Sequence, residues 1–545
     1  MSRGLKIISV SLLGIAALAA GGHYYLWQQH ATFARAQVEK AIAAVNAQKQ
    51  MISYSAIATS GYPRYVDISI ENPKVSGRVD EWMQLLADMG KASHLERAQQ
   101  QAAIDALPEW TTDISLSGHI KLRSNLLAGR YSVIVSGAIT SASDIAGVKE
   151  SSTSQPQGDS VCDIALSYRE SLFDRLMMQL KSEAAAKGEL AALNCNFPAS
   201  RYVSESGEML TSTAGAMLKL NLSPSFQPTR TITFAAEVKD AEFSPAGDKL
   251  IEMYARALSP QMIYNNRLSV YGKQNVSISF SFNGPTDLAQ LGGEAPLDVA
   301  IDKFSFRNDA YQSDISLKLN KTTANGQSQG QLDLTAKSTF TPVYQSIIRD
   351  LFSDLAREAL ANPNPEWDLS GFTAESLSEA LQPAIPDLAS LGTLTQTLRA
   401  NFSGNPAAGS GELNLTELEL SATPYGITGK GKAARAAGQL SPTGNVELSC
   451  RQCPVMIDDI AAYTARLEQV LLRTGAIKPY EFPLDAATLG RFKSFLSQLA
   501  VKEAEGSWRF VIASSAEAPP SINGKPFAEV MALYQQLLMP TPQQP

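Results

Sequence analysis

Histidine and charge are both scarce in this chain. Only four of the 545 residues are His, and none follows His119. Ser-His-Asp triads and HExxH zinc sites both require His, so most of the chain is excluded from these two kinds of site. We interpret His94 and His119 as ordinary surface or strand residues. Charged residues make up 18% and hydrophobic residues 44% of the chain, which is enough apolar material for a core.

Concentrated positive charge is also missing. The net charge is −7, and the basic residues form only short pieces such as Lys430 and Lys432. Phosphate binding needs a dense basic patch, so nucleic acid is excluded as a partner. The acidic residues are scattered and form no paired carboxylates. The sequence therefore predicts no catalytic, cofactor-binding or metal-binding residue, no cofactor, and a protein that is not an enzyme.

A stretch without any charge lies near the N-terminus, at residues 7–27. As a helix, its roughly 20 residues match the roughly 30 Å hydrocarbon core of a bilayer. Arg3 and Lys6 precede this stretch and no acid does, which favours a cytoplasmic N-terminus and export of the rest. The sequence predicts a transmembrane signal-anchor over residues 1–28, with a single pass through a membrane, the N-terminus in the cytoplasm and the rest of the chain exported.

The end of this stretch allows two interpretations. Tyr24, Tyr25 and Trp27 would lie at the outer membrane–water interface, where amphipathic aromatic rings are favoured. The alternative is a cleaved signal peptide, because residues 17–19, Ala-Leu-Ala, resemble a small-x-small cleavage site. Both interpretations export the chain, but only the first one keeps it attached to the membrane.

Cysteine is limited to Cys162, Cys195, Cys450 and Cys453. An even number in an exported chain favours disulfides, and pairing of neighbours joins Cys162 to Cys195 and Cys450 to Cys453. The first bond would close a long loop, worth roughly 3–4 kcal/mol in the chain-entropy model. The second would close a CxxC motif, for which a redox or metal role is the alternative to a structural one.

Most of the chain after residue 51 alternates apolar and polar residues. This period of two is typical of antiparallel strands with one dry face and one wet face. We predict an α+β fold, with the N-terminal transmembrane helix followed by mainly antiparallel, long twisted β-sheet or sheets packed with amphipathic helices. The clearest strands are expected around Val66–Ile70, Ile114–Leu122, Tyr131–Val135, Ile232–Val238, Val276–Phe282, Ile315–Leu319 and Leu332–Leu334.

Helix and boundary signals separate these strands. A short polar residue followed by Pro predicts helices that start near residues 244, 341 and 453. Other helices are expected at 78–107, 373–381 and 527–538. The predicted domains after the anchor are a stalk helix (29–50), a β-rich periplasmic domain (51–360), a Pro-rich linker (361–395) and a C-terminal β-plus-helix domain (396–545).

Three segments depart from the regular pattern. The polar residues 141–160 predict a loop. The alternation slips by one between Leu415 and Leu418, which predicts a β-bulge. Residues 426–433 (GITGKGKA) resemble phosphate-binding loops, but no Ser or Thr follows Lys432, so we expect a Gly-rich strand edge or hairpin.

The layout as a whole resembles the AsmA/TamB-like and YdgA-like bacterial envelope proteins. The resemblance depends on the N-terminal anchor, on residues 61–63 (Gly-Tyr-Pro) at an early strand, on long Ser/Thr-rich strands, and on residues 523–527 (NGKPF). It implies an inner-membrane tether with a periplasmic body, and in the AsmA/TamB branch a role in lipid traffic or outer-membrane assembly. No catalytic residue of these families is available to transfer.

The apolar strand faces allow three functions. If amphipathic helices leave these faces partly open, they form a groove for acyl chains, and the protein is an envelope-maintenance protein that contacts or transfers lipid. If the faces are closed, the chain is a scaffold partner of an envelope complex. The third possibility is a periplasmic hydrolase that works without His. The expected partners are the lipid bilayer and either phospholipid or other envelope proteins.

Overall fold

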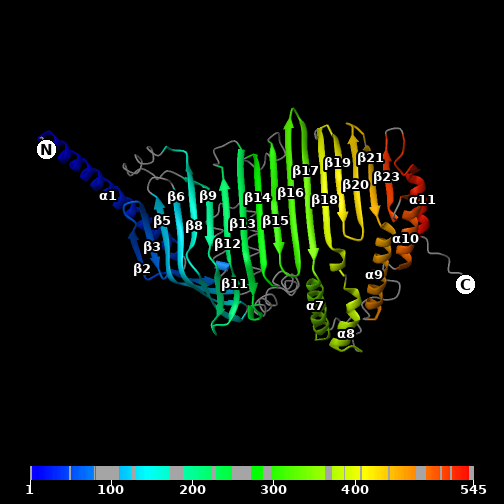
Figure 1. Ribbon diagram of the computed structural model, residues 1–545, viewed down its shortest axis with the longest axis horizontal. Helices are drawn as coiled ribbons and strands as arrows, with labels where there is room; N and C mark the ends of the chain where they lie inside the picture. The colour runs from blue at the N-terminus through cyan, green and yellow to red at the C-terminus, as the bar shows by residue number, and fades with distance from the viewer. Residues whose placement is uncertain are drawn as a thin grey trace. The chain divides into compact units, whose positions relative to one another are not determined.

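The computed structural model consists mainly of antiparallel strands, with helices at the N-terminus and in the second half of the chain (Figure 1). The chain divides into two compact units, which we describe separately: unit 1 is residues 1–227 and 232–275, and unit 2 is residues 228–231 and 276–545. The structure describes residues 3–47, 51–78, 80–81, 110–125, 130–145, 147–171, 188–223, 229–247, 272–285, 296–361, 371–385, 387–405, 408–439, 442–473, 486–503, 506–515 and 518–538.

The first helix, α1, covers Arg3–Asn46. Its second half was predicted to be a stalk, but it is part of the core of unit 1: Ala31 is only 4% exposed and packs with Val66 and Ile68 of strand β3 (Tyr65–Glu71). The small side chain of Ala31 lets the helix backbone approach the sheet closely, and Trp27 packs beside it. In the described part of the chain, no helix combines the length and the apolar character needed to cross a membrane.

Unit 1 is a sheet in which every defined pairing is antiparallel. From one edge inward, β2 pairs with β3, β3 with β5, and β5 with β6 along its whole length. The strands are β1 (Ile52–Ser53), β2 (Ala56–Ser60), β3, β4 (Lys74–Arg78), β5 (Trp110–Asn125), β6 (Arg130–Ile145), β7 (Val148–Pro156), β8 (Ser160–Tyr168), β9 (Gly188–Phe197), β10 (Ser200–Ser204), β11 (Met209–Thr213), β12 (Gly215–Leu222) and β13 (Thr229–Phe243).

Beyond β6 the sheet of unit 1 consists of interrupted strands. The first half of β6 pairs with β8 and its second half with β7. The next position in the sheet is shared by two consecutive strands, β9 and β10. The position after that is shared by β11 and β12. The single strand β13 then forms hydrogen bonds with both β11 and β12.

These interruptions line up across the sheet, and we call the line they form the crease. On β5 and β6 it passes through Gly118 and Gly137, which lie directly opposite each other. It continues through residues where short breaks or left-handed backbone angles replace regular strand. These residues are Tyr54 and Ser55, Asn72 and Pro73, residues 157–159, Pro198 and Ala199, Ala214 and Gly215, and Asp240.

The crease divides the sheet into two chemically different parts. On the side of β8, β9 and β12, one face of the strands carries mainly apolar residues, such as Cys162, Leu193 and Leu218. On the other side, β7, β10 and β11 are rich in Ser and Thr. The predicted loop at 141–160 was therefore wrong, because β6 runs to Ile145 and β7 follows it. Hydroxyl pairs such as Thr140 with Thr153, 3.1 Å apart, stabilise these polar strands.

Unit 2 contains a longer run of regular antiparallel strands. Each of β15 to β20 pairs with the next strand along the chain, and β21 pairs with β23. The strands are β14 (Gln274–Pro285), β15 (Leu297–Arg307), β16 (Tyr311–Ala324), β17 (Gln327–Phe340), β18 (Thr393–Asn405), β19 (Ser410–Ser421), β20 (Gly426–Arg435), β21 (Thr443–Arg451), β22 (Val501–Lys502), β23 (Trp508–Ser514), β24 (Ser521–Ile522) and β25 (Lys525–Pro526).

The helices of unit 2 lie at the strand ends and beside β23 (Figure 1). The helix starts predicted at 341 and 453, and the helices predicted near 373–381 and 527–538, are confirmed. Thr373 begins α8 with a capping box that it forms with Ser376. The helices are α7 (Pro342–Ala361), α8 (Ala374–Leu381), the short η2 (Gln382–Ala384) and η3 (Ala389–Leu391), α9 (Cys453–Arg473), α10 (Ala486–Leu499) and α11 (Phe527–Leu538).

The predicted α+β class with a mainly antiparallel sheet is confirmed, but the chain divides elsewhere than predicted. The predicted linker, residues 361–395, joins β17 to β18, and these two strands pair along most of their length. The segment is therefore an excursion from one sheet, and the two units separate at residues 228–275. The helices predicted at 78–107 and after 244 lie largely outside the described residues.

Candidate functional site

One face of the unit 2 sheet carries apolar side chains in register across eight strands. Residues directly opposite each other on paired strands share a face, and so do residues two positions apart on one strand. Leu317, Leu334 and Leu398 are direct neighbours in this sense on β16, β17 and β18. We call this surface the apolar band; its residues are Val299, Ile301, Leu317, Leu319, Leu332, Leu334, Leu398, Ala400, Leu413, Leu415, Leu418, Leu420, Ile427, Val446, Leu448, Phe510 and Ile512.

The opposite face of the same strands is polar, with charges that alternate in sign. Arg399 on β18 contacts Asp333 on β17 at 3.3 Å and also pairs with Glu417 on β19. Further along, Glu447 on β21 is 3.5 Å from Arg509 on β23. Asp333, and after it Glu417, raises the pKa of Arg399. Exposed ion pairs add little to stability because water and salt screen them, so this row of charges keeps the face hydrated more than it stabilises the fold.

The apolar band is partly exposed to solvent. When a second layer covers a sheet, side chains of this kind become almost fully buried. Here Leu413 and Leu420 are each 49% exposed, Ile512 is 39% exposed, Ala400 is buried, and the rest of the band is half-buried. Among the residues that the structure describes, this is the pattern of an open apolar face and not of a closed core.

Two local features keep the band continuous. The predicted bulge is confirmed, since the pairing register shifts between Leu415 and Leu418, so the extra residue returns Leu418 to the apolar face. The Gly-rich segment 426–433 forms β20, an interior strand and not an edge. A side chain at Gly429 would come within 2.7 Å of Leu448, so the neighbouring leucines fill its place in the band.

One margin of the band is closed by helices. Cys450 and Trp508 on this margin pack with Ile457 of α9, and Leu496 of α10 packs against them. The disulfide between Cys450 and Cys453 lies in this cluster, and the two residues are only 4% and 3% exposed. Redox motifs need a partly exposed sulfur, so this location fits a structural bond that joins β21 to the start of α9.

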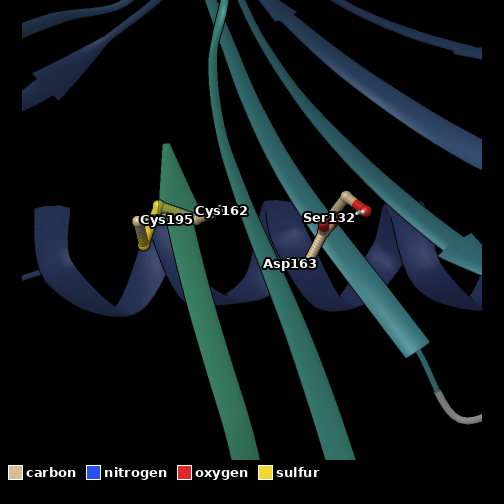
Figure 2. Close-up of a disulfide and its surroundings, with 4 residues drawn as sticks. All are labelled: Ser132, Cys162, Asp163 and Cys195. Carbon is tan, nitrogen blue, oxygen red and sulfur yellow. Dashed lines mark hydrogen bonds between the residues drawn. A yellow bond between two sulfur atoms is a disulfide. The ribbon is translucent and has the colours of Figure 1, made fainter. Parts of the chain in front are cut away.

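The other disulfide lies in unit 1, on an apolar face near the crease. Cys162 on β8 and Cys195 on β9 are directly opposite each other and bonded, as Figure 2 shows. Val133 and Leu218 are their neighbours in the same row. Asp163, the next residue, points to the other face, where it accepts a hydrogen bond of 2.6 Å from the Ser132 hydroxyl (Figure 2).

A polar pocket of about 740 Å³ lies on the Ser/Thr-rich side of the crease. Burial, and then the charge of Glu205, raises the pKa of Glu150 in this pocket. Hydroxyl groups in the lining form hydrogen bonds with one another; for example, the hydroxyl oxygens of Thr112 and Ser143 are 3.2 Å apart. Its lining is Gly77, Arg78, Glu81, Thr111, Thr112, Asp113, Ala142, Ser143, Asp144, Lys149, Glu150, Ser151, Ser204, Glu205 and Ser206.

The sequence analysis missed this pocket because its residues come from segments that it assigned to loops or did not connect. The acids looked scattered, and only the strand pairing brings Glu150 and Glu205 to one place. The sequence did contain one signal, the Ser-Ser-Thr-Ser run at 151–154, but that run predicts a loop as readily as a strand. His119 lies on β5 within the sheet, and His94 is outside the described residues.

Comparisons of the chain with family models, with curated proteins and with solved structures give no match.

Proposed function

We propose that this chain is a non-enzymatic protein of the bacterial envelope, anchored in the inner membrane by residues 7–27, with a periplasmic body that holds the acyl chains of a lipid on the apolar band. The observation that carries this proposal is a continuous band of aliphatic side chains, partly exposed, on one face of a sheet whose other face is charged. The layout that resembles AsmA/TamB-like proteins agrees with such a role.

The size of the band fits a lipid tail. Eight strands spaced about 4.8 Å apart give a band roughly 34 Å long across the sheet. One leaflet of the hydrocarbon core is about 15 Å thick, so a single acyl chain lying along the band would be covered along its length. Burying exposed aliphatic surface contributes about 25 cal/mol per Å², so an acyl chain is a favourable occupant.

Two positions on neighbouring strands allow a matched experiment. Leu420 is on the band, 49% exposed, and Thr428 is an exposed residue on the polar face of the adjacent strand. The full chain carries benzoylphenylalanine at one position or the other, is illuminated in membranes, and is purified in mild detergent for mass analysis of attached lipid. We expect lipid adducts at position 420 and few at 428.

A second arm separates an open face from a closed core. Leu420→Gln and Ile512→Gln change exposed positions, so the doubly substituted chain keeps its unfolding midpoint if the face is open. We expect it to lose most of the lipid that co-purifies with the unsubstituted chain. Equal adducts at 420 and 428, or no co-purifying lipid from the unsubstituted chain, would overturn the proposal. A large fall in the unfolding midpoint would instead indicate a closed core and support the scaffold alternative.

A further inference from the structure

Aromatic residues from two separate elements gather at one place in unit 1, and all but the half-buried Trp27 are exposed. His23, Tyr24 and Trp27 belong to α1, and Tyr62 belongs to the turn between β2 and β3. The ring centroid of Tyr62 lies 5.3 Å from that of Tyr24, 5.6 Å from that of Trp27 and 5.8 Å from that of His23. We call these four residues the aromatic cluster.

The aromatic cluster is fixed to the sheet through Trp27, and the rings of Tyr24 and Tyr62 remain exposed to solvent. The indole nitrogen of Trp27 donates a hydrogen bond of 2.6 Å to the backbone oxygen of Tyr65, which fixes the helix to the start of β3. Tyr24 and Tyr62 nevertheless remain 48% and 43% exposed, and the adjacent Tyr25 is 59% exposed. Tyr24 and Tyr62 therefore expose large aromatic rings at a position that the packing of α1 on β3 holds in place.

The position of this cluster in the chain indicates what covers it. The cluster lies at the C-terminal end of residues 7–27, the stretch without charge, so on the proposed anchor it falls at the edge of the hydrocarbon core. Tyr and Trp rings favour this level of a bilayer because one part of the ring is apolar and the other forms hydrogen bonds. Arg64, exposed on the same turn, can meet lipid phosphates.

We propose that Tyr62 and its turn, together with Tyr24 and Trp27, form a seat by which unit 1 rests on the headgroup region of a phospholipid bilayer. This inference depends on the anchor in the proposed function but not on lipid binding by the apolar band. Because α1 continues past Trp27 directly onto β3, the seat holds the sheet against the membrane surface at a fixed angle, without a free stalk between them.

Nitroxide labelling tests the seat on the full chain. All four native cysteines are in disulfides, so one introduced cysteine can be labelled selectively. The labels are placed by Tyr62→Cys, by Arg64→Cys on the same turn, and by Tyr202→Cys as the control, since Tyr202 is 40% exposed on β10. The chain is reconstituted into vesicles of phosphatidylethanolamine and phosphatidylglycerol, and accessibility to oxygen and to a soluble nickel chelate is compared.

We expect labels at positions 62 and 64 to lie within about 5–10 Å of the headgroup–acyl boundary, with a severalfold higher ratio of oxygen to nickel accessibility than the label at 202. Labels at 62 and 64 that match the aqueous label at 202 would overturn the seat and leave the anchor intact. A chain that does not float with the vesicles would overturn the anchor and the seat together. Loss of lipid from the apolar band would change neither result.

Discussion

At the scale of single residues, Glu150 links the polar pocket to the pH dependence of folding. Burial and the charge of Glu205 raise its pKa in the folded chain, so the folded state keeps a proton that the unfolded state releases. Above the unfolded pKa of about 4.3, the free energy of unfolding therefore falls as the pH rises through the raised folded value. Stability from this group is fully present only at acidic pH.

Glu150→Gln tests this contribution. The amide keeps the shape of the carboxyl group without its charge, so we expect the variant to melt at a higher temperature than the unsubstituted chain at neutral pH, and the difference to vanish below about pH 4. Thermal melting of the full chain in mild detergent at several pH values measures this. Glu208→Gln, at an exposed residue of the same unit, is the control for the substitution itself. A lower melting temperature for Glu150→Gln at neutral pH would contradict the prediction.

Single residues also show what the sequence could and could not predict. The strand around Leu317 was predictable because its apolar residues alternate, and the bulge at Leu415 and Leu418 because the alternation slips there. The packing of Ala31 was not, because an Ala-rich helix face carries a weak apolar signal. The segment 141–160 was missed because Ser and Thr occupy both faces of its strand, so no period of two is visible.

At the scale of elements, the crease is the feature that no local pattern could predict. It is made of short irregularities on separate strands, and only the register brings them into one line. At its centre β5 and β6 approach so closely that both strands need Gly. A side chain added at Gly137 would lie 2.1 Å from the backbone oxygen of Ser117, and the φ angle of Gly137 is +108°.

Gly137→Ala is therefore expected to destabilise unit 1 by more than about 2 kcal/mol, because it combines a backbone clash with a left-handed angle that disfavours a side chain. Denaturant unfolding of the full chain, followed by circular dichroism, provides the measurement. Gly158→Ala is the matched control on the same crease, since its added atom would be 3.9 Å from the nearest neighbour, and we expect a change within about 0.5 kcal/mol. Equal losses for the two variants would show that the close approach at Gly137 is not what requires Gly.

At the scale of the whole molecule, the openness of the apolar band was beyond the sequence, because alternation shows that a strand has one apolar face but not what covers it. The exposure of Leu413 and Leu420 depends on where the helices of unit 2 lie, and in the part of the chain that the structure describes α9 and α10 pack against the margin at Cys450 and Trp508. The proposed anchor supports the proposed lipid binding by the apolar band, because a tether at the membrane would keep the protein close to a source of lipid.

The tether itself is decided by the N-terminus of the mature chain. We expect intact mass measurement of the protein isolated from membranes to include residues 7–27, because this stretch continues past the Ala-Leu-Ala at 17–19 to Trp27, further than a cleaved signal needs. Ala17→Leu with Ala19→Leu is the control that cannot be cleaved there, and it should have the same N-terminus and membrane retention as the unsubstituted chain. A mature chain that begins at Ala20 would remove the tether, and with it the seat formed by Tyr62, while leaving the apolar band to be tested separately.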